Sequence, residues 1–318
     1  MKSTISQPVN LPDFSNLSMD FDIVDCHHHL FNLDEVYYPW LTDRPENNFL
    51  LGNYDGIKHN YLPEAFKADT GELRVIKTVH VEAEADHDDP VSETSWLSDI
   101  IEGSDVHTAM VAHSWLHLDN SEAVLEEQAS YSAVRGIRSK PITAATAARR
   151  DEVRGEAGSM QDETWRRGLG MLRTYDLSWD LRVPFWHLLE AADVCGLHPD
   201  LPIVVEHTGL AWDRSEAGLA EWRQGMLALA AHPHVYLKIS ELGLAGDPWD
   251  YIANRRVVRE AIEIFGFNRC MFASNFPVAG LRIGYVDQVK AIAHMISDCS
   301  NAERSALFHD TAVDFYRL

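Results

Sequence analysis

The sequence has few cysteines and a deficit of cations. Its four cysteines, at positions 26, 195, 270 and 299, lie far apart and form no CxxC pair. This spacing excludes a zinc ribbon and fits reduced thiols in a cytoplasmic protein better than a disulfide scaffold. Because 27 Lys and Arg stand against 49 Asp and Glu, the formal net charge is −22. Such a field repels phosphate backbones and anionic membranes, so we expect neither nucleic acid nor membrane as a partner.

Long apolar runs and breaks in composition are also missing. No stretch approaches a transmembrane span, and the leader before Met19 has no sustained apolar core of the kind found in signal peptides. The 318 residues suffice for two ordinary domains or one large α/β barrel. We expect an N-terminal arm over residues 1–20, which either frays or wraps a neighbouring subunit of a homo-oligomer. A single domain is expected over residues 21–318.

What the chain does contain is a regular alternation of apolar, strand-like runs with helical patterns. The first run leads into the histidines at 27–29, and the others cover residues 75–82, 106–113, 134–138, 178–184, 202–207, 235–240 and 270–276. This order predicts a (β/α)8 barrel (TIM barrel), with a doubly wound sheet as the alternative. Polar residues at the carboxyl ends of the runs favour the barrel, because barrel active sites form at that face.

The first run ends in three consecutive histidines, within residues 24–29 (VDCHHH). Since alternate side chains of a strand share a face, we expect Asp25, His27 and His29 on one face and Cys26 and His28 on the other. Two imidazoles that converge at a strand end suit a metal ion or proton transfer. A run of solvated histidines is the alternative.

Seven short motifs occur in order along the chain: VDCHHH (24–29), YPWL (38–41), VRGIR (134–138), LSWDL (177–181), EHTG (206–209), LKIS (237–240) and MFASNFPV (271–278). Together they resemble the amidohydrolase superfamily. The nearest branch is the amidohydrolase-related (amidohydrolase 2) family with its sugar-lactone and pyrone-dicarboxylate lactonases. The resemblance implies hydrolysis at a barrel mouth, with the first-strand HxH pair at His27 and His29 and the sixth-strand histidine at His207.

This chain departs from the binuclear members of the superfamily at three places. Those members use a lysine or glutamate on strand four, a histidine on strand five and an aspartate on strand eight. Here Arg138, Asp180 and Asn275 stand at these places, so a two-metal site is not expected. We expect either no metal or one divalent ion, zinc or manganese, held by His27, His29 and His207.

Asn275 cannot take a proton from water near neutral pH. Another group must serve as the base, or the hydrolytic activity is lost. We rank Asp180 first, ahead of Glu82 and Glu241. Glu206 is expected to point towards the helical layer, because it alternates with the neighbouring His207.

Cationic side chains near the same strand ends predict the substrate. Lys238 lies on the polar face of its strand and points into the barrel, where a buried ammonium needs a partner such as Asp180 or Glu82. Its functional role would be to bind a substrate carboxylate or to polarise a lactone carbonyl. Arg138 and Arg182 together can form a cationic pocket for an anionic or polyhydroxylated small molecule. We also expect Glu82 and Trp40 to contact substrate. Trp40 belongs to an aromatic loop, residues 31–51, which either roofs a pocket or packs over the barrel rim.

The expected function is therefore a hydrolase, a lactonase that opens a sugar lactone or a lactone bearing a carboxylate. The expected catalytic residues are His27, His29, His207, Asp180 and Asn275. Two alternatives remain open. One is a metal-dependent decarboxylase of an aromatic acid, and the other is a catalytically silent barrel that binds a small ligand.

Overall fold

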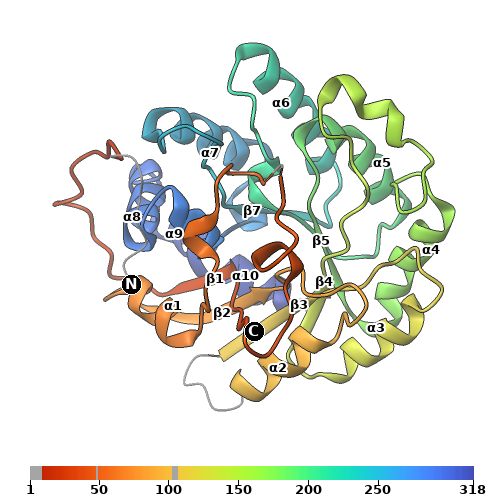
Figure 1. Ribbon diagram of the computed structural model, residues 1–318. Helices are drawn as coiled ribbons and strands as arrows, with labels where there is room; N and C mark the ends of the chain where they lie inside the picture. The colour runs from red at the N-terminus through yellow and green to blue at the C-terminus, as the bar shows by residue number, and fades with distance from the viewer. Residues whose placement is uncertain (1–8, 48, 102–106) are drawn as a thin grey trace.

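The computed structural model describes residues 9–47, 49–101 and 107–318. Within them, eight parallel strands form one sheet in sequence order, β1 to β8. A bridge between His28 and Phe276 joins the segment that follows the last strand to the first strand. Helices surround the strands (Figure 1). The fold is the expected (β/α)8 barrel.

The strands are short and follow one another at regular intervals. They are β1 (Ile23–His28), β2 (Val75–Val81), β3 (His107–Ala112), β4 (Val134–Ile137), β5 (Ser178–Leu181), β6 (Ile203–Val205), β7 (Val235–Ile239) and β8 (Cys270–Phe272). The helices are α1 (Pro63–Thr70), α2 (Ser92–Ile101), α3 (Ser121–Ser130), α4 (Glu163–Met171), α5 (Leu188–Leu197), α6 (Glu216–Ala230), α7 (Tyr251–Phe265), α8 (Tyr285–Met295), α9 (Asn301–Ser305) and α10 (Thr311–Tyr316).

Each of the strands β2 to β8 ends at least one residue earlier than we expected. The polar residues that follow them belong to turns, because several adopt left-handed backbone conformations that no strand can accommodate. The values of φ are 55° at His207, 42° at Glu241 and 56° at Asn275. Helix α1 is a further difference, since we expected no helix there. It has only eight residues, starts at Pro63 and is followed by Gly71 with φ of 58°.

A bulge in β1 corrects the expected facing of its side chains. Asp25 pairs with Thr78 and His28 with His80, so β1 uses one residue more than β2. As a result Cys26 packs with the residues that fill the barrel. Asp25 instead accepts hydrogen bonds from the Ser274 amide and from the Tyr285 hydroxyl of α8. The expectation that Asp25 shares a face with His27 and His29 was therefore wrong.

An apolar cluster occupies part of the barrel interior, and the last helix packs against it. It contains Val24, Cys26, Val79, Val81, Ala109, Val111, Val204, Met271 and Ala273, with Ala312, Phe315 and Tyr316 of α10 packed against them. Burial of these side chains favours folding at roughly 25 cal/mol per Å² of apolar surface.

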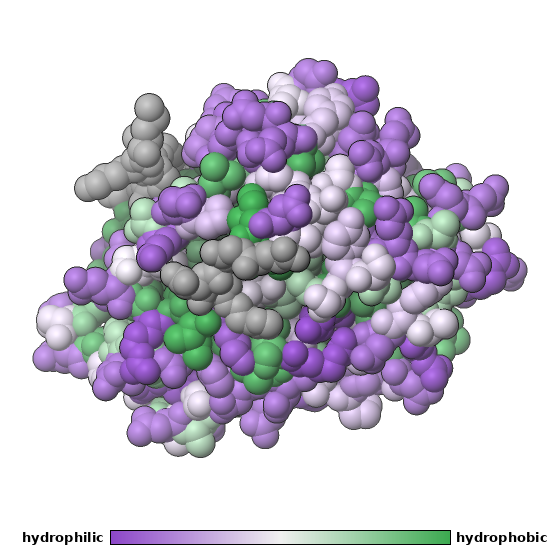
Figure 2. Space-filling view, turned by 90° about the horizontal axis from the view of Figure 1, so that it is seen from below, coloured by the Kyte–Doolittle hydropathy of each residue, from purple (hydrophilic) through white to green (hydrophobic). Residues whose placement is uncertain are grey.

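The described part of the N-terminal segment, from residue 9 onward, packs against the barrel of the same chain. Residues 1–8 of the predicted arm lie outside the described residues. Val9, Leu11 and Phe14 pack against the hydrophobic core, and Asn10 forms a bridge with Asp250. On the face drawn in Figure 2, hydrophilic side chains predominate and hydrophobic ones form small groups between them. Among the described helices, none is long and apolar enough to cross a membrane.

Candidate active site

A cavity of about 550 Å³ opens at the carboxyl ends of the strands. Six of the residues expected at the site line it, and they are His29, Trp40, Arg138, Arg182, His207 and Asn275. Four others do not line it and are buried in the barrel, namely His27, Glu82, Asp180 and Lys238. The expected residues thus form two layers, one that faces the cavity and one behind it.

Three imidazoles meet at the floor of this cavity. The ring centroid of His27 lies 5.0 Å from that of His29 and 4.6 Å from that of His207. Burial lowers the pKa of all three, to about 3 for His29, and the nearby cations Lys238 and Arg138 lower it further. The rings are therefore neutral at pH 7, and each neutral ring has one nitrogen that can accept a proton or bind a metal ion.

Glu206 faces the barrel interior, contrary to our expectation. Its Oε1 lies 3.3 Å from Nδ1 of His27, and its Oε2 lies 3.3 Å from Nη1 of Arg138. The inward direction follows from alternation with Val204, which also faces inward. His207 reaches the same floor only because its φ of 55° turns the chain. Alternation with the apolar Val204 could therefore have predicted the inward direction of Glu206 from the sequence.

The floor can hold one divalent cation. Ligand atoms of His27, Glu206 and His207 all lie within 4.8 Å of one another, and all three residues are buried. Nε2 of His27 and Oε1 of Glu206 are buried without a hydrogen-bond partner. Two imidazole nitrogens and a carboxylate oxygen form a donor set that suits zinc. These ligands differ from the expected His27, His29 and His207, because Glu206 replaces His29.

Nε2 of His29 instead faces the amide of Asn275. It lies 3.1 Å from Oδ1 of Asn275, and Nδ1 of His29 donates to the Val81 carbonyl oxygen at 2.7 Å. Nδ2 of Asn275 donates to Oε2 of Glu241 at 2.5 Å. Glu241, one of the three carboxylates considered as bases, therefore bonds directly to a residue that lines the cavity.

Burial raises the pKa of Glu241 to about 7, although hydrogen bonds from Asn275 and Gly243 oppose the rise. An acid with a raised folded-state pKa contributes stability below its unfolded pKa, and this contribution is lost as the pH rises through the folded value. We therefore expect the melting temperature of Glu241→Gln, relative to the wild type, to rise between about pH 5 and about pH 8. Thermal melts of both proteins across this range test it, and a constant difference would contradict it.

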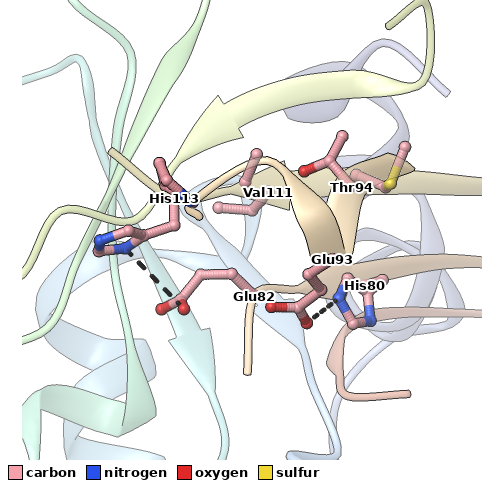
Figure 3. Close-up of a pocket in the computed structure, with 9 residues that line it drawn as sticks. His80, Glu82, Glu93, Thr94, Val111 and His113 are labelled. Carbon is pink, nitrogen blue, oxygen red and sulfur yellow. Dashed lines mark hydrogen bonds and ion pairs between the residues drawn. The ribbon is translucent and has the colours of Figure 1, made fainter. Parts of the chain in front are cut away.

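Glu82 and Arg138 form a buried ion pair behind the cavity wall. Nε of Arg138 donates to Oε1 of Glu82 at 2.6 Å. Burial by itself would raise the pKa of Glu82, but Arg138 and His113 lower it to about 2. Figure 3 shows Glu82 directed at His113, with Nδ1 of His113 3.9 Å from Oε2 of Glu82. Glu82 thus stays ionised and holds Arg138 in place.

Asp180 lies too deep in the barrel to act as the base for a water molecule in the cavity. Its Oδ2 accepts from Nζ of Lys238 at 2.5 Å and from the Tyr316 hydroxyl at 2.8 Å. Lys238 does point into the barrel, and Asp180 is one of the two partners that we considered for it. Both side chains are fully buried. This buried ion pair is part of the barrel interior, where the two charges compensate each other.

Two cations stand in the cavity wall. Burial lowers the pKa of Lys140 to about 8, with Arg182 adding to the effect, and Lys140 forms an ion pair with Glu84. Among the described residues, Arg182 has no hydrogen-bond or ion-pair partner. We expected Arg182 here but missed Lys140 and Glu84. Both lie just beyond strand ends, where the barrel geometry alone could have suggested them.

Aromatic side chains form the outer walls. Trp40 stacks on Phe49 with ring centroids 5.5 Å apart, and Trp186 lies 5.7 Å from Trp212. All four line the cavity. Trp40 also donates to the Ala83 carbonyl oxygen at 2.7 Å. The aromatic loop at 31–51 therefore contributes to the wall of the pocket.

The chain belongs to the amidohydrolase family, because the family model described as "Amidohydrolase" (Amidohydro_2) matches residues 24–318. It is 34% identical over 299 residues to protein y4mH of Sinorhizobium fredii, covering 94% of this chain and 99% of that one. It is 27% identical over 309 residues to L-fucono-1,5-lactonase of Burkholderia multivorans, covering 93% and 96%.

A crystal structure of an amidohydrolase from Burkholderia multivorans with bound zinc is similar to this barrel. Its TM-score is 0.74 at 25% sequence identity, and the match covers 94% of this chain and 100% of that one. The family and these relatives support an amidohydrolase-type hydrolase. The resemblance seen in the seven sequence motifs is confirmed.

Proposed function

We propose that this protein hydrolyses a lactone, either a sugar lactone or one that bears a carboxylate. The observation that carries the proposal is the meeting of neutral imidazoles and cations in one cavity. His29 and His207 line the floor, and Arg182 and Lys140 line the wall. The relative named L-fucono-1,5-lactonase supports the same reaction class.

Lactone hydrolysis needs an anchor for the substrate, a proton acceptor for water and donors for the developing oxyanion. Arg182 and Lys140 can bind carboxylate or hydroxyl oxygens of the substrate by charge-assisted hydrogen bonds. The neutral ring of His207 can accept the proton of the attacking water, while the Ser240 hydroxyl, 3.0 Å from Nδ1, orients the ring. Water adds to the carbonyl carbon, the ring C–O bond breaks, and the alkoxide leaving group takes a proton.

A divalent ion, zinc or manganese, would be held by His27, Glu206 and His207. Bound there, it would occupy the free nitrogen of His207 and would supply a Lewis acid that lowers the pKa of the attacking water, in place of the imidazole as proton acceptor. His29 is then left free of the ion, which fits its hydrogen bonds to Val81 and Asn275.

The proposal is tested by a panel of sugar lactones and carboxylate-bearing lactones, followed by acid release with a pH indicator. We expect ring opening with at least one of them above the spontaneous rate. Carbon dioxide release from aromatic acids, with no lactone opened, would favour the decarboxylase instead. Thermal stabilisation by a lactone without any product would indicate a silent binding barrel.

Arg182 should select for a carboxylate on the substrate. For Arg182→Leu we expect KM for a carboxylate-bearing lactone to rise about 10- to 100-fold, since a hydrogen bond to a charged group contributes about 1.5–3 kcal/mol. KM for a neutral lactone should change little. Arg173→Leu is the matched control, because Arg173 is half exposed and pairs with Asp200. Equal changes in KM for both substrates would show that Arg182 does not bind the carboxylate.

A further inference from the structure

The side chain of Asn275 connects two groups that lie on opposite sides of it. One is the imidazole of His29, which lines the cavity, and the other is the carboxyl group of Glu241, which does not. Asn275 and Glu241 both have positive φ, at 56° and 42°. A left-handed backbone is uncommon for a glutamate, and such conformations persist where the surrounding structure enforces them.

The residues around the Glu241 carboxyl group are closely packed. The Gly243 amide donates to Oε1 at 3.3 Å. A Cβ atom added to Gly243 would lie 3.0 Å from the same oxygen and 3.1 Å from Cγ of Arg282. Glu241 is only 4% exposed. The charged groups that act on it are the guanidinium groups of Arg282, after β8, and Arg182, after β5.

Hydrogen-bond chemistry restricts how this chain of groups can be arranged. The Val81 carbonyl can only accept, so Nδ1 of His29 carries a proton. An ionised Glu241 can also only accept, so Nδ2 of Asn275 must face it and Oδ1 must face His29. A protonated Glu241 can donate to Oδ1, and then Nδ2 faces Nε2 of His29. The two ends of an amide are assigned from such partners.

We propose that Glu241 is a positioning residue whose carboxyl group decides whether Asn275 presents Oδ1 or Nδ2 to Nε2 of His29. Its effect on catalysis rests on the proposed lactone hydrolysis. With Oδ1 presented, Asn275 could accept from Nε2 only if both ring nitrogens of His29 carried protons, so Nε2 of the neutral ring receives no hydrogen bond from Asn275. With Nδ2 presented, it donates one to the lone pair of Nε2. Glu241 therefore controls the hydrogen-bonding state of an imidazole that it does not touch.

The test compares Glu241→Gln and Glu241→Leu with the wild type by nitrogen-15 spectroscopy of the histidine side chains. The His29 resonance is identified by its absence from His29→Gln. Glutamine keeps a hydrogen bond to Asn275 but cannot ionise, and leucine offers none. Glu216→Gln is the control, because the side chain of Glu216 is 81% exposed and pairs with Arg256.

We expect the wild-type Nε2 resonance of His29 to change with pH near the pKa of Glu241, and the change to vanish in Glu241→Gln. In Glu241→Leu the resonance should differ from that of the wild type at every pH. On a lactone that the enzyme opens, Glu241→Leu should lower kcat by about 10- to 100-fold with little change in KM, while Glu241→Gln stays within a few fold.

Persistence of the pH-dependent change in Glu241→Gln would overturn the proposal. So would a wild-type His29 resonance in Glu241→Leu. These spectra need no substrate, so they decide the role of Glu241 even if the lactone panel yields no product. Failure of the panel alone would therefore count against the proposed function and leave the positioning role standing.

Discussion

Replacing Lys238 by methionine is expected to lower the free energy of unfolding by about 3–5 kcal/mol. Methionine fills most of the space of the lysine side chain, but it leaves the Asp180 carboxylate in the barrel without its ammonium partner. Both side chains of the pair are fully buried, and Nζ lies 2.5 Å from Oδ2. The hydroxyl of Tyr316 remains as a donor to Asp180, but a neutral hydroxyl does not compensate a buried charge. Chemical denaturation of the two proteins measures the loss.

Two further variants show whether the loss comes from the unpaired charge. Arg256→Met removes an ion pair with Glu216 that is 45% and 81% exposed, and exposed pairs contribute only about 0–1 kcal/mol. In the double variant Lys238→Met/Asp180→Asn the buried carboxylate is gone, so the loss should be smaller than in the single variant. A loss below about 1 kcal/mol in Lys238→Met would contradict the account of a paired buried charge.

His207→Asn is expected to lower kcat for lactone opening by about 10²- to 10⁴-fold, the range for loss of a general acid or base. The ring lines the cavity floor and is held by the Ser240 hydroxyl at 3.0 Å from Nδ1. Asparagine is of similar polarity but cannot accept a proton near neutral pH. The same change removes one of the three candidate metal ligands, so the metal content of the purified variant should also fall.

His59→Asn is the matched control, because His59 is exposed and does not line the cavity. It should leave kcat and the metal content unchanged. If His207→Asn retained wild-type kcat with a normal melting temperature, the proton acceptor would have to be sought elsewhere on the floor, at His29 or Glu206.

The barrel and six of the residues that line the cavity could be predicted from the sequence, chiefly from the strand-helix order and from polar residues at strand ends. The inward direction of Lys238 also followed from alternation within its strand, which left Asp180 and Glu82 as alternative partners. Regular alternation is what a single sequence shows well.

Two of the wrong expectations fall where a strand stops being regular. The bulge in β1 between Asp25 and His28 separated the face of Asp25 from that of His27. The left-handed turn at His207 allowed both His207 and Glu206 to face the floor. Whether a residue has positive φ or sits in a bulge depends on tertiary contacts, and although histidine is enriched among residues with positive φ, this enrichment does not identify an individual position. The sequence also could not show that Asn275 lies between His29 and Glu241, since these three residues belong to three separate strand ends.

The most direct test of the central claim is ring opening in water enriched in oxygen-18. Attack of water on the lactone carbonyl, the reaction that the floor of this cavity is proposed to perform, places the label in the new carboxylate of the product. Mass spectrometry of the product, with a reaction without enzyme as the control, measures it. We predict one labelled oxygen, in the carboxylate. Label in the hydroxyl group, or no ring opening across the panel, would contradict the account.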